Sequence, residues 1–194
     1  MPFGLENRGV TLRRFLWVVP ARDHASGATT TGSIRYRPPT PSDGRALWQL
    51  AGTSGLDVNS AYAYVMWADH FAESSIVAVT EMNRVVGFVN GFRPPSDPTT
   101  LFVWQIAVAP EVRGRGVGGR MLDELLARSP ARWLEATVTP SNVASAALFR
   151  GTATRHETGV EEAIGYPRAL LPDDHEAEIR FRIGPLEATR QPIA

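Results

Sequence analysis

Residues 113–118 read Arg-Gly-Arg-Gly-Val-Gly, and their surroundings constrain the fold of this chain more than any other feature. An apolar run over residues 101–108 has the character of a buried strand, and an amphipathic helical pattern follows the glycines. Free backbone N–H groups point outward at a helix start, and the helix dipole favours negative charge there. Gly114 and Gly116 let the backbone approach a ligand closely. The segment therefore predicts a binding site for a phosphate or pyrophosphate group.

The rest of the chain alternates between strand-like and helical patterns. Strands are predicted over residues 34–37, 75–80, 85–92, 101–108, 132–138 and 176–183. Helices are predicted from about 40 to 52, 60 to 72, 116 to 128 and 140 to 149, and residues 151–174 are predicted to be irregular. The order β-α-α-β-β-β-α-β-α-β predicts an α/β (α+β) fold with a mixed central sheet flanked by helices.

The composition excludes several classes of protein. A length of 194 residues suits one domain with a sizeable core. The 20 basic and 20 acidic side chains balance, so no basic field favours nucleic acid. The sequence has no cysteine, which excludes disulfides, cysteine metal sites and a cysteine nucleophile. Because the apolar runs are also far shorter than the roughly 20 residues of a membrane helix, we expect a cytoplasmic protein without metal, membrane or nucleic-acid partners.

The first 31 residues differ in character from the rest. Residues 12–20 are basic and then apolar, but this run is too short for a signal peptide and no convincing cleavage site follows. Residues 26–33 are small and polar, as in a flexible linker. We therefore expect a flexible N-terminal tail over residues 1–31 and one domain over residues 32–194.

The glycine turn departs from two common phosphate-binding motifs. A dinucleotide-binding turn needs Gly-x-Gly-x-x-Gly and an acidic residue about 20 positions on, where this chain has Val138 and Thr139. A P-loop needs Gly-Lys-Ser/Thr, and no lysine is near. Residues 105–110 (Gln-Ile-Ala-Val-Ala-Pro), followed by residues 113–118 and the amphipathic helix, instead resemble the acetyl-CoA signature of the GNAT N-acyltransferase superfamily.

This resemblance implies a fold in which the strand over residues 101–108 splays from the strand over residues 132–138 and opens a cleft for acetyl-CoA. The amides of residues 113–119 would surround the pyrophosphate, and the N–H of Ile106 or Val108 would polarise the thioester oxygen. The residues that the resemblance assigns to acetyl-CoA are Ile106, Ala107, Val108, Arg113, Gly114, Arg115, Gly116, Val117, Gly118, Gly119, Asn142 and Phe149.

Asn142 has an alternative role, and Phe149 differs from the residue that is common in the superfamily. Asn142 follows Pro140 and is equally suited to cap the next helix. Many GNAT members have a tyrosine at the position of Phe149, where it protonates the departing thiolate, but a phenylalanine cannot donate a proton. Another group or water would then do this work, or the thiolate would leave unprotonated.

Longer segments resemble the L-2,4-diaminobutyrate acetyltransferase family of ectoine biosynthesis. They are residues 55–62 (GLDVNSAY), 66–71 (MWADHF), 93–95 (RPP), 101–105 (LFVWQ) and 134–142 (LEATVTPSN), and the similarity covers roughly residues 34–183. The family transfers an acetyl group from acetyl-CoA to the 4-amino nitrogen of L-2,4-diaminobutyrate. The resemblance also implies a homodimer.

The implied substrate carries two ammonium groups and one carboxylate, so its pocket needs acids, a cation or N–H donors, and an aromatic wall. The positions that match the family's substrate site are Asp57, Tyr62, Trp104, Thr137 and Glu178. Three have plainer alternatives: Asp57 as a helix cap, Trp104 in core packing, and Glu178 on a solvated strand face.

The amine has a pKa near 10, so it must lose a proton before it attacks. The candidate groups are Glu135, Glu178, His175 and water, and the residues do not choose among them. Glu135 and Thr137 interrupt an otherwise apolar strand, and a buried carboxylate needs a partner or a raised pKa, so Glu135 is a candidate general base or a holder of one ammonium group. Direct attack in a ternary complex is expected, because no cysteine or well-placed serine suggests an acyl-enzyme.

Two other functions fit part of this pattern. A GNAT enzyme for another amine, such as lysine, ornithine or a polyamine, would keep the acetyl-CoA site and change the amine pocket. A non-catalytic sensor of acyl-CoA would bind the cofactor without turnover, and Phe149 is its only support in the sequence.

Overall fold

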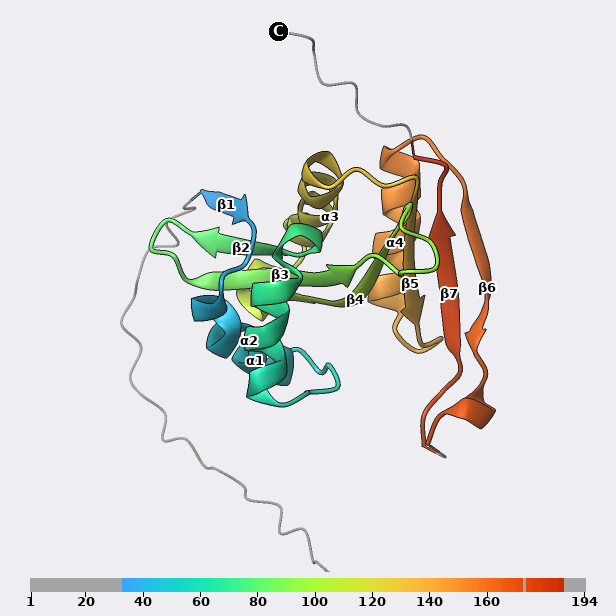
Figure 1. Ribbon diagram of the computed structural model, residues 1–194, viewed down its shortest axis with the longest axis horizontal. Helices are drawn as coiled ribbons and strands as arrows, with labels where there is room; N and C mark the ends of the chain where they lie inside the picture. Colours follow the sequence, from blue (N-terminus) through green and yellow to red (C-terminus); the bar gives the residue numbers. More distant parts are fainter. Residues whose placement is uncertain (1–32, 173, 187–194) are drawn as a thin grey trace, which may run out of the picture. The chain divides into compact units, whose positions relative to one another are not determined.

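The computed structural model describes residues 33–172 and 174–186, and these residues build one mixed β-sheet with helices on both faces (Figure 1). The expectation for residues 1–31 lies outside the described residues. The seven strands are β1 (Ile34–Arg37), β2 (Ile76–Thr80), β3 (Val85–Phe92), β4 (Thr100–Val108), β5 (Trp133–Val138), β6 (Val160–Tyr166) and β7 (Glu178–Ile183). The helices are α1 (Gly44–Thr53), α2 (Ala61–His70), α3 (Val117–Arg128) and α4 (Val143–Arg155). The α/β fold class expected from the sequence is confirmed.

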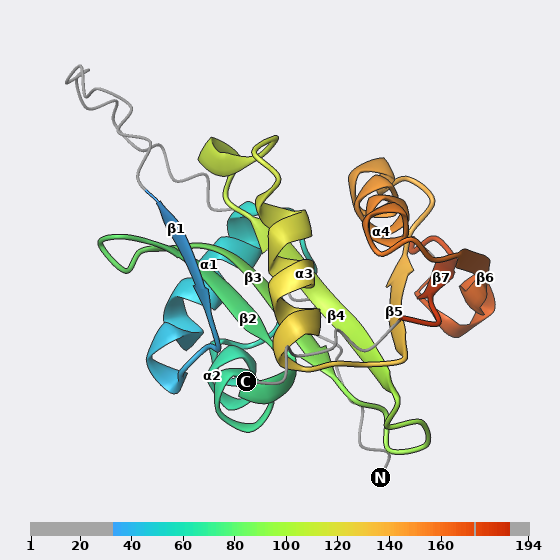
Figure 2. The ribbon, with the colours of Figure 1, turned by 90° about the horizontal axis from the view of Figure 1, so that it is seen from above.

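The strand order is β1-β2-β3-β4-β5-β7-β6, and only the β4–β5 pair is parallel. That pair is short. Residues Thr100–Val103 pair with Trp133–Ala136, and beyond them the two strands separate. In Figure 2, β4 and β5 run apart from the end where they pair. The predicted splay of the central strands is therefore present, and it leaves one edge of β4 without a partner strand.

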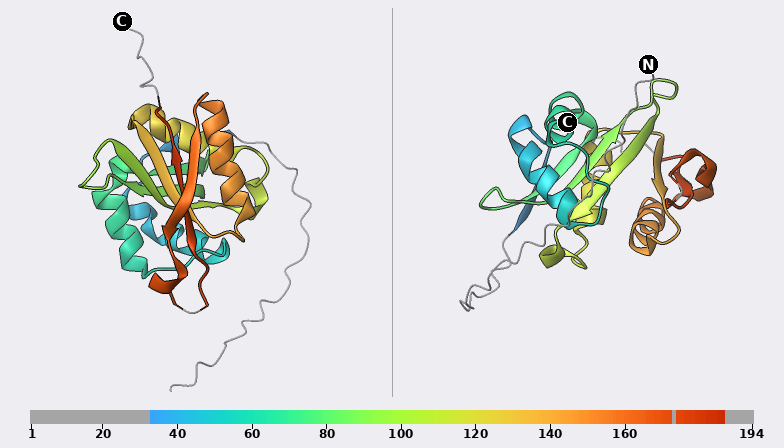
Figure 3. Two further views of the ribbon diagram at one scale, coloured as in Figure 1. Left: turned by 90° about the vertical axis from the view of Figure 1, so that its right-hand side faces the viewer. Right: turned by 90° about the horizontal axis from the view of Figure 1, so that it is seen from below.

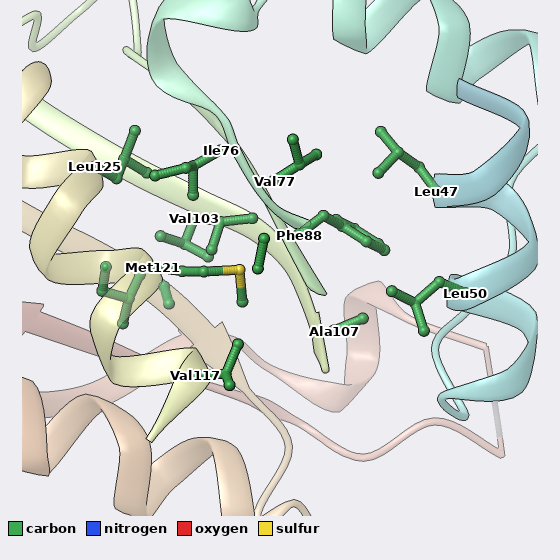
Figure 4. Packing of buried hydrophobic residues seen from close by; sticks show 14 of the residues in the cluster. Leu47, Leu50, Ile76, Val77, Phe88, Val103, Ala107, Val117, Met121 and Leu125 are labelled. Carbon is green, nitrogen blue, oxygen red and sulfur yellow. The ribbon is translucent and has the colours of Figure 1, made fainter. Parts of the chain in front are cut away.

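The core lies on both faces of β2, β3 and β4 (Figure 4). Leu47 and Leu50 of α1 approach from one side, and Val117 and Met121 of α3 approach from the other. All of these side chains are buried, and Phe88 of β3 lies between α1 and the sheet. Burial of large apolar side chains contributes roughly 1.5–3 kcal/mol each, so this two-sided core fixes the strands that border the cleft.

Local capping explains where two helical segments begin, a 3-10 turn over Pro41–Asp43 that leads into α1, and α2 itself. The Thr40 backbone N–H donates to Asp43 Oδ2 (2.8 Å), and the guanidinium of Arg37 binds the same carboxylate through two hydrogen bonds of 2.8 and 2.9 Å. Ser60 Oγ accepts from the N–H of Ala63 and caps α2 (3.3 Å). Such caps contribute about 1 kcal/mol each, and they agree with the sequence signals at both positions.

The prediction that residues 151–174 are irregular was wrong. Helix α4 continues to Arg155, and β6 pairs with β7 at the edge of the sheet (Figure 3). The β6 sequence gave no clean alternation because an edge strand needs no continuous apolar face, and its Ile164 and Tyr166 are exposed. The last strand begins at Glu178, two residues later than expected, so Glu176 belongs to the loop before it.

Within residues 33–172 and 174–186, no helix is long and apolar enough to cross a membrane. The same residues hold no group of three or more histidine, cysteine or acidic side chains arranged for a metal ion.

Candidate active site

The glycine turn leads directly into α3. Gly114 and Gly116 have φ angles of +72° and +74°, a left-handed conformation that strains any other residue. Gly116 caps α3, and the N–H groups of the first turn have no acceptor four residues before them in the helix. No acidic side chain lies in that first turn. The free N–H donors of the turn and the positive end of the α3 dipole therefore face the same space.

That place is a cleft of about 410 Å³. Its walls come from the loop after α1, the second half of β4, the glycine turn with the start of α3, and the start of α4. The lining residues are Ser54, Leu56, Ile106, Ala107, Val108, Val112, Arg113, Gly114, Gly116, Val117, Gly118, Gly119, Asn142, Ala144, Ser145 and Leu148. Ten of the twelve positions expected to contact acetyl-CoA are among them, all except Arg115 and Phe149.

The glycines inside α3 have different neighbours. A Cβ at Gly119 would lie 3.0–3.1 Å from the guanidinium of Arg155, which also binds Asp123. A Cβ at Gly118 would make ordinary contacts with Leu148, at 3.5 Å. Gly119 therefore allows α3 and α4 to approach closely, which sets the width of the cleft between them.

The unpaired edge of β4 supplies the hydrogen-bonding groups of the cleft floor. The N–H of Ala109 donates to Val86 of β3 (2.8 Å), and alternate residues of a strand present their N–H groups to opposite edges. The N–H groups of Ile106 and Val108 therefore point toward the open edge. Arg113 Nε donates to the carbonyl oxygen of Val108 at the end of that edge (2.9 Å).

A second, smaller pocket of about 70 Å³ continues the cleft between the splayed strands. Both pockets share Leu56, Ile106, Asn142 and Ser145. Asn142 Oδ1 accepts from the N–H of Ser145 (3.1 Å), so Asn142 caps α4 and lines both pockets at once. Phe149 is buried, lines the smaller pocket and packs against Phe181 of β7 (ring centroids 6.1 Å apart).

Strand β4 contains a bulge beside the smaller pocket, on the side of the sheet that α2 covers. Asn90 of β3 is opposite Gln105 and Gly91 is opposite Val103, which leaves Trp104 as the extra residue. The indole of Trp104 stacks on Trp67 of α2, with ring centroids 4.4 Å apart. Trp104 is therefore both packed and part of a pocket wall, since it also lines the smaller pocket.

A histidine and two carboxylates meet beside this bulge. His175 Nε2 lies 3.8 Å from Asp57 Oδ2 and 3.8 Å from Glu178 Oε1. The Asp57 side chain is 95 % exposed, whereas that of Glu178 is 18 % exposed. Two segments that are distant in sequence, the loop that carries Asp57 and residues 175–178, thus form one acidic group around an imidazole.

The surroundings of His175 raise its pKa above the usual 6.5. The largest cause is the hydrogen bond between Nδ1 and the carbonyl oxygen of Glu176 (2.7 Å), which favours the protonated ring. Partial burial opposes this effect, and the charges of Glu178, Asp57 and Asp174 add to it. The loop that carries Glu176 is further held by a hydrogen bond from the Ser141 hydroxyl to the Glu176 carboxylate.

Two expected positions lie apart from this group. Arg182 of β7 donates to the Glu135 carboxylate, and the same guanidinium lies 3.6 Å from Asp97 and 4.4 Å from the ring of Trp133. Glu135 lines neither pocket, whereas Thr137 lines the smaller one. Tyr62, at the start of α2, is 75 % exposed and lines neither pocket.

Sequence reasoning missed Leu56, Gln105 and Ser145 as residues of the site. Gln105 Nε2 donates to the carbonyl oxygen of Asp57 (2.9 Å) and closes the pocket from the α2 side. A polar residue in the middle of an otherwise apolar strand was the available signal for Gln105. Ser145 follows Asn142 by three residues, so helical spacing places both on one face of α4.

Comparison with known proteins adds to this geometry. The model of the acetyltransferase (GNAT) family matches residues 45–152. The L-2,4-diaminobutyric acid acetyltransferase of Shouchella clausii is 47 % identical over 154 residues, which cover 77 % of this chain and 86 % of the relative. The chain belongs to the diaminobutyrate acetyltransferase family.

Further members of the family agree. The enzyme of Marinococcus halophilus is 46 % identical over 157 residues, covering 79 % of this chain and 91 % of the relative. A solved structure of the diaminobutyrate acetyltransferase from Paenibacillus lautus, in complex with L-2,4-diaminobutyric acid and coenzyme A, has 39 % identity and a TM-score of 0.75. The match covers 79 % of this chain and 96 % of that one.

Proposed function

We propose that this protein transfers the acetyl group of acetyl-CoA to the 4-amino nitrogen of L-2,4-diaminobutyrate, a step of ectoine biosynthesis. The observation that carries the proposal is the acidic group of Asp57 and Glu178 around His175, beside the bulge that borders the cleft. A substrate with two ammonium groups on a short carbon chain suits two carboxylates and an aromatic wall. Family membership supports the same substrate.

The cofactor half of the site is assigned to backbone groups. The N–H groups of residues 113–119 and the dipole of α3 would hold the pyrophosphate of acetyl-CoA, and Arg113 and Arg115 would add positive charge. The thioester of acetyl-CoA supplies the activated acetyl group. The N–H groups of Ile106 and Val108 would stabilise negative charge on the thioester oxygen, because they are fixed by the β3–β4 ladder before the reaction begins. Asn142 would contact the pantetheine arm.

The amine half is assigned to side chains. Asp57 and Glu178 would bind the ammonium groups, and Trp104 would form the wall against the carbon chain. Thr137 would offer a hydroxyl from the β5 side. Tyr62 would cover the substrate from α2 only if its exposed ring turns toward Asp57 when the substrate binds.

Proton transfer is assigned to Glu178 and His175. The amine must be neutral to attack. His175 lies between Glu178 and Asp57, and the Asp57 carbonyl is bound by Gln105 of the smaller pocket's wall, so both groups would take the proton directly or through water. Glu135 was the third candidate. Its pairing with Arg182 supports a role in holding β5 to β7 rather than in proton transfer. The amine would then attack the thioester directly, without an acyl-enzyme.

Phe149 lies where a proton donor for the thiolate is common, and its ring offers none. We propose that water or Ser145, which lines both pockets, stabilises the departing thiolate. We also propose a cytoplasmic homodimer, supported by the absence of cysteine and by the exposed Ile164 and Tyr166 on the edge strand β6.

The test is thiol release from acetyl-CoA by the purified protein, with diaminobutyrate compared against lysine, ornithine, diaminopropionate and spermidine. A strong preference for diaminobutyrate, with the acetyl group on N4 by NMR, is expected. Preference for another amine would overturn the substrate assignment and keep the cofactor site. Tight binding of CoA without any turnover would support a sensor instead.

A further inference from the structure

The loop between α1 and α2 carries Asp57 and has few attachments of its own. Within the described part of the chain, residues 55–59 form two hydrogen bonds. One runs from the N–H of Leu56 to Ala51, at a weak 3.4 Å, and the other joins the Asp57 carbonyl oxygen to Gln105 (2.9 Å). Gly55 in this loop has a φ angle of +76°. The direction of the Asp57 carboxylate therefore depends on what holds its backbone.

Gln105 is well suited to hold that backbone. It is only 8 % exposed, and its position is fixed because β4 is paired with β3 on both sides of the bulge. Its amide nitrogen is committed to Asp57, while its amide oxygen is buried without a protein partner among the described residues. Loss of this bond, which joins residues 48 positions apart, would leave the buried amide nitrogen of Gln105 without a partner, and an unpaired buried donor is costly.

The bond also connects two chemical parts of the site. Gln105 lies between Trp104, which borders the substrate pocket, and Ile106, whose N–H points to the open edge of β4. Through the Asp57 carbonyl it orients the carboxylate that lies 3.8 Å from His175. We infer that Gln105 is a positioning residue, which fixes the amine-binding carboxylate of Asp57 relative to the thioester-binding strand. This inference rests on the proposed function, since it assigns Asp57 to the amine.

The test is a double-mutant cycle in the full chain. Gln105→Met keeps the length and volume of the side chain and removes the donor. We expect it to raise the KM for diaminobutyrate about tenfold, the size of one well-placed hydrogen bond, with the KM for acetyl-CoA and kcat within about twofold. In the Asp57→Ala background the same substitution should change the KM for diaminobutyrate less than about twofold.

Controls separate this role from a general effect on the bulge. Asn90 is buried directly opposite Gln105 and does not bond to the loop, so Asn90→Leu should leave the ratio of the two KM values unchanged. If Gln105→Met does not fold, Gln105→Glu replaces it, because an ionised carboxylate keeps the length but cannot donate. Equal increases in both KM values, an undiminished effect in the Asp57→Ala background, or the same effect from Asn90→Leu would overturn the inference.

A second readout does not depend on the substrate. Hydrogen exchange of the amides of residues 55–60 should become faster in Gln105→Met and stay unchanged in Asn90→Leu. Unchanged exchange in Gln105→Met would overturn the inference even with a normal enzyme. Failure of the unaltered protein to acetylate diaminobutyrate would instead overturn the proposed function, and the exchange measurement would still decide whether the loop is held by Gln105.

Discussion

The two halves of the cleft are built in different ways. The part of the cleft assigned to the cofactor comes mainly from one stretch, residues 106–119, where a strand end and a helix start present backbone N–H groups, with further wall residues from the starts of α4 and of the loop after α1. The amine half comes from the loop before α2, the bulge of β4, β5 and the loop before β7, and uses side chains. Backbone geometry in a short segment depends on a few glycines, whereas a side-chain pocket depends on the whole sheet.

The two halves should therefore tolerate different substitutions. Side chains such as Arg115 can change at the cofactor half as long as the glycines keep the backbone open. At the amine half, a single substitution alters a charge or a contact that no neighbour replaces. The two halves should therefore fail separately, with different kinetic constants affected.

The largest effect is expected at the glycine turn. A Cβ at Gly116 would meet nothing within 4 Å, so a large side chain would enter the space assigned to the pyrophosphate. Gly116→Trp should raise the Kd for acetyl-CoA by about a hundredfold or more, since it blocks several charge-assisted contacts. Calorimetry would measure this. Gly159→Trp, at an exposed glycine with equally open surroundings outside the cleft, is the control. Unchanged affinity in Gly116→Trp would contradict the assignment of the cofactor half.

The next largest effect is expected at Glu178, and Glu135, a carboxylate of similar exposure, should respond differently. Glu178→Gln removes a charge from the amine half and should raise the KM for diaminobutyrate about thirtyfold, with that for acetyl-CoA unchanged. Glu135, 12 % exposed and paired with Arg182, is the matched control. Glu135→Gln should lower the free energy of unfolding by about 1–2 kcal/mol, measured by urea titration, with little change in kcat. A hundredfold fall in kcat in Glu135→Gln would make Glu135 the base.

A pH profile should reveal His175 on the amine half alone. If Asp57 and Glu178 bind the substrate's ammonium groups as proposed, a protonated His175 would compete for the same two carboxylates. The kcat/KM for diaminobutyrate should therefore rise several-fold as the pH increases through a pKa above 6.5, and His175→Asn should remove this step. His70→Asn, at an exposed histidine at the end of α2, should leave the rise in kcat/KM unchanged.

The same raised pKa has a defined sign for stability. A raised pKa in the folded state means that the contribution of His175 to the free energy of unfolding is fully present below its unfolded pKa. It is lost as the pH rises through the folded-state value. A profile that is identical in the wild type and His175→Asn would remove His175 from the acidic group.

The smallest effect is expected where the two halves meet. Phe149→Tyr places a hydroxyl in the smaller pocket, near the position assigned to the thioester. Because this hydroxyl could protonate the thiolate, kcat should rise, by no more than about threefold if water already serves. Stopped-flow detection of thiol release would measure it. A fall of tenfold or more would mean that the pocket has no room for the hydroxyl.

Local sequence patterns reach the residues that line the larger cleft more completely than those of the acidic group, for a physical reason. A strand, a glycine turn and a helix start follow one another along the chain, so local patterns were enough to locate residues 106–119. Asp57, His175 and Glu178 meet only because β7 lies beside β5 and the β4 bulge turns toward α2. No local pattern encodes that meeting, and the resemblance to a family supplied these residues instead.

Some features could not be inferred from the residues at all. The ion pair of Glu135 with Arg182 depends on the register of β5 and β7, in which the two are directly opposite. Strand β6 has exposed apolar residues and adjacent acids, which local reasoning interpreted as irregular. In both cases the missing information was the position of a neighbouring strand.

The bulge at Trp104 links the opening of the cleft to the number of residues in β4. Where the two strands pair, residues 102–108 of β4 lie opposite residues 87–92 of β3, and the one surplus residue increases the local twist just where β5 departs. A chain that lacked Trp104 would have a regular ladder, with Val103 and Gln105 adjacent and every side chain still on its proper face. It would keep the core strands paired and lose both the aromatic wall and the added twist, so one extra residue in a strand shapes the amine half as much as the charges around it.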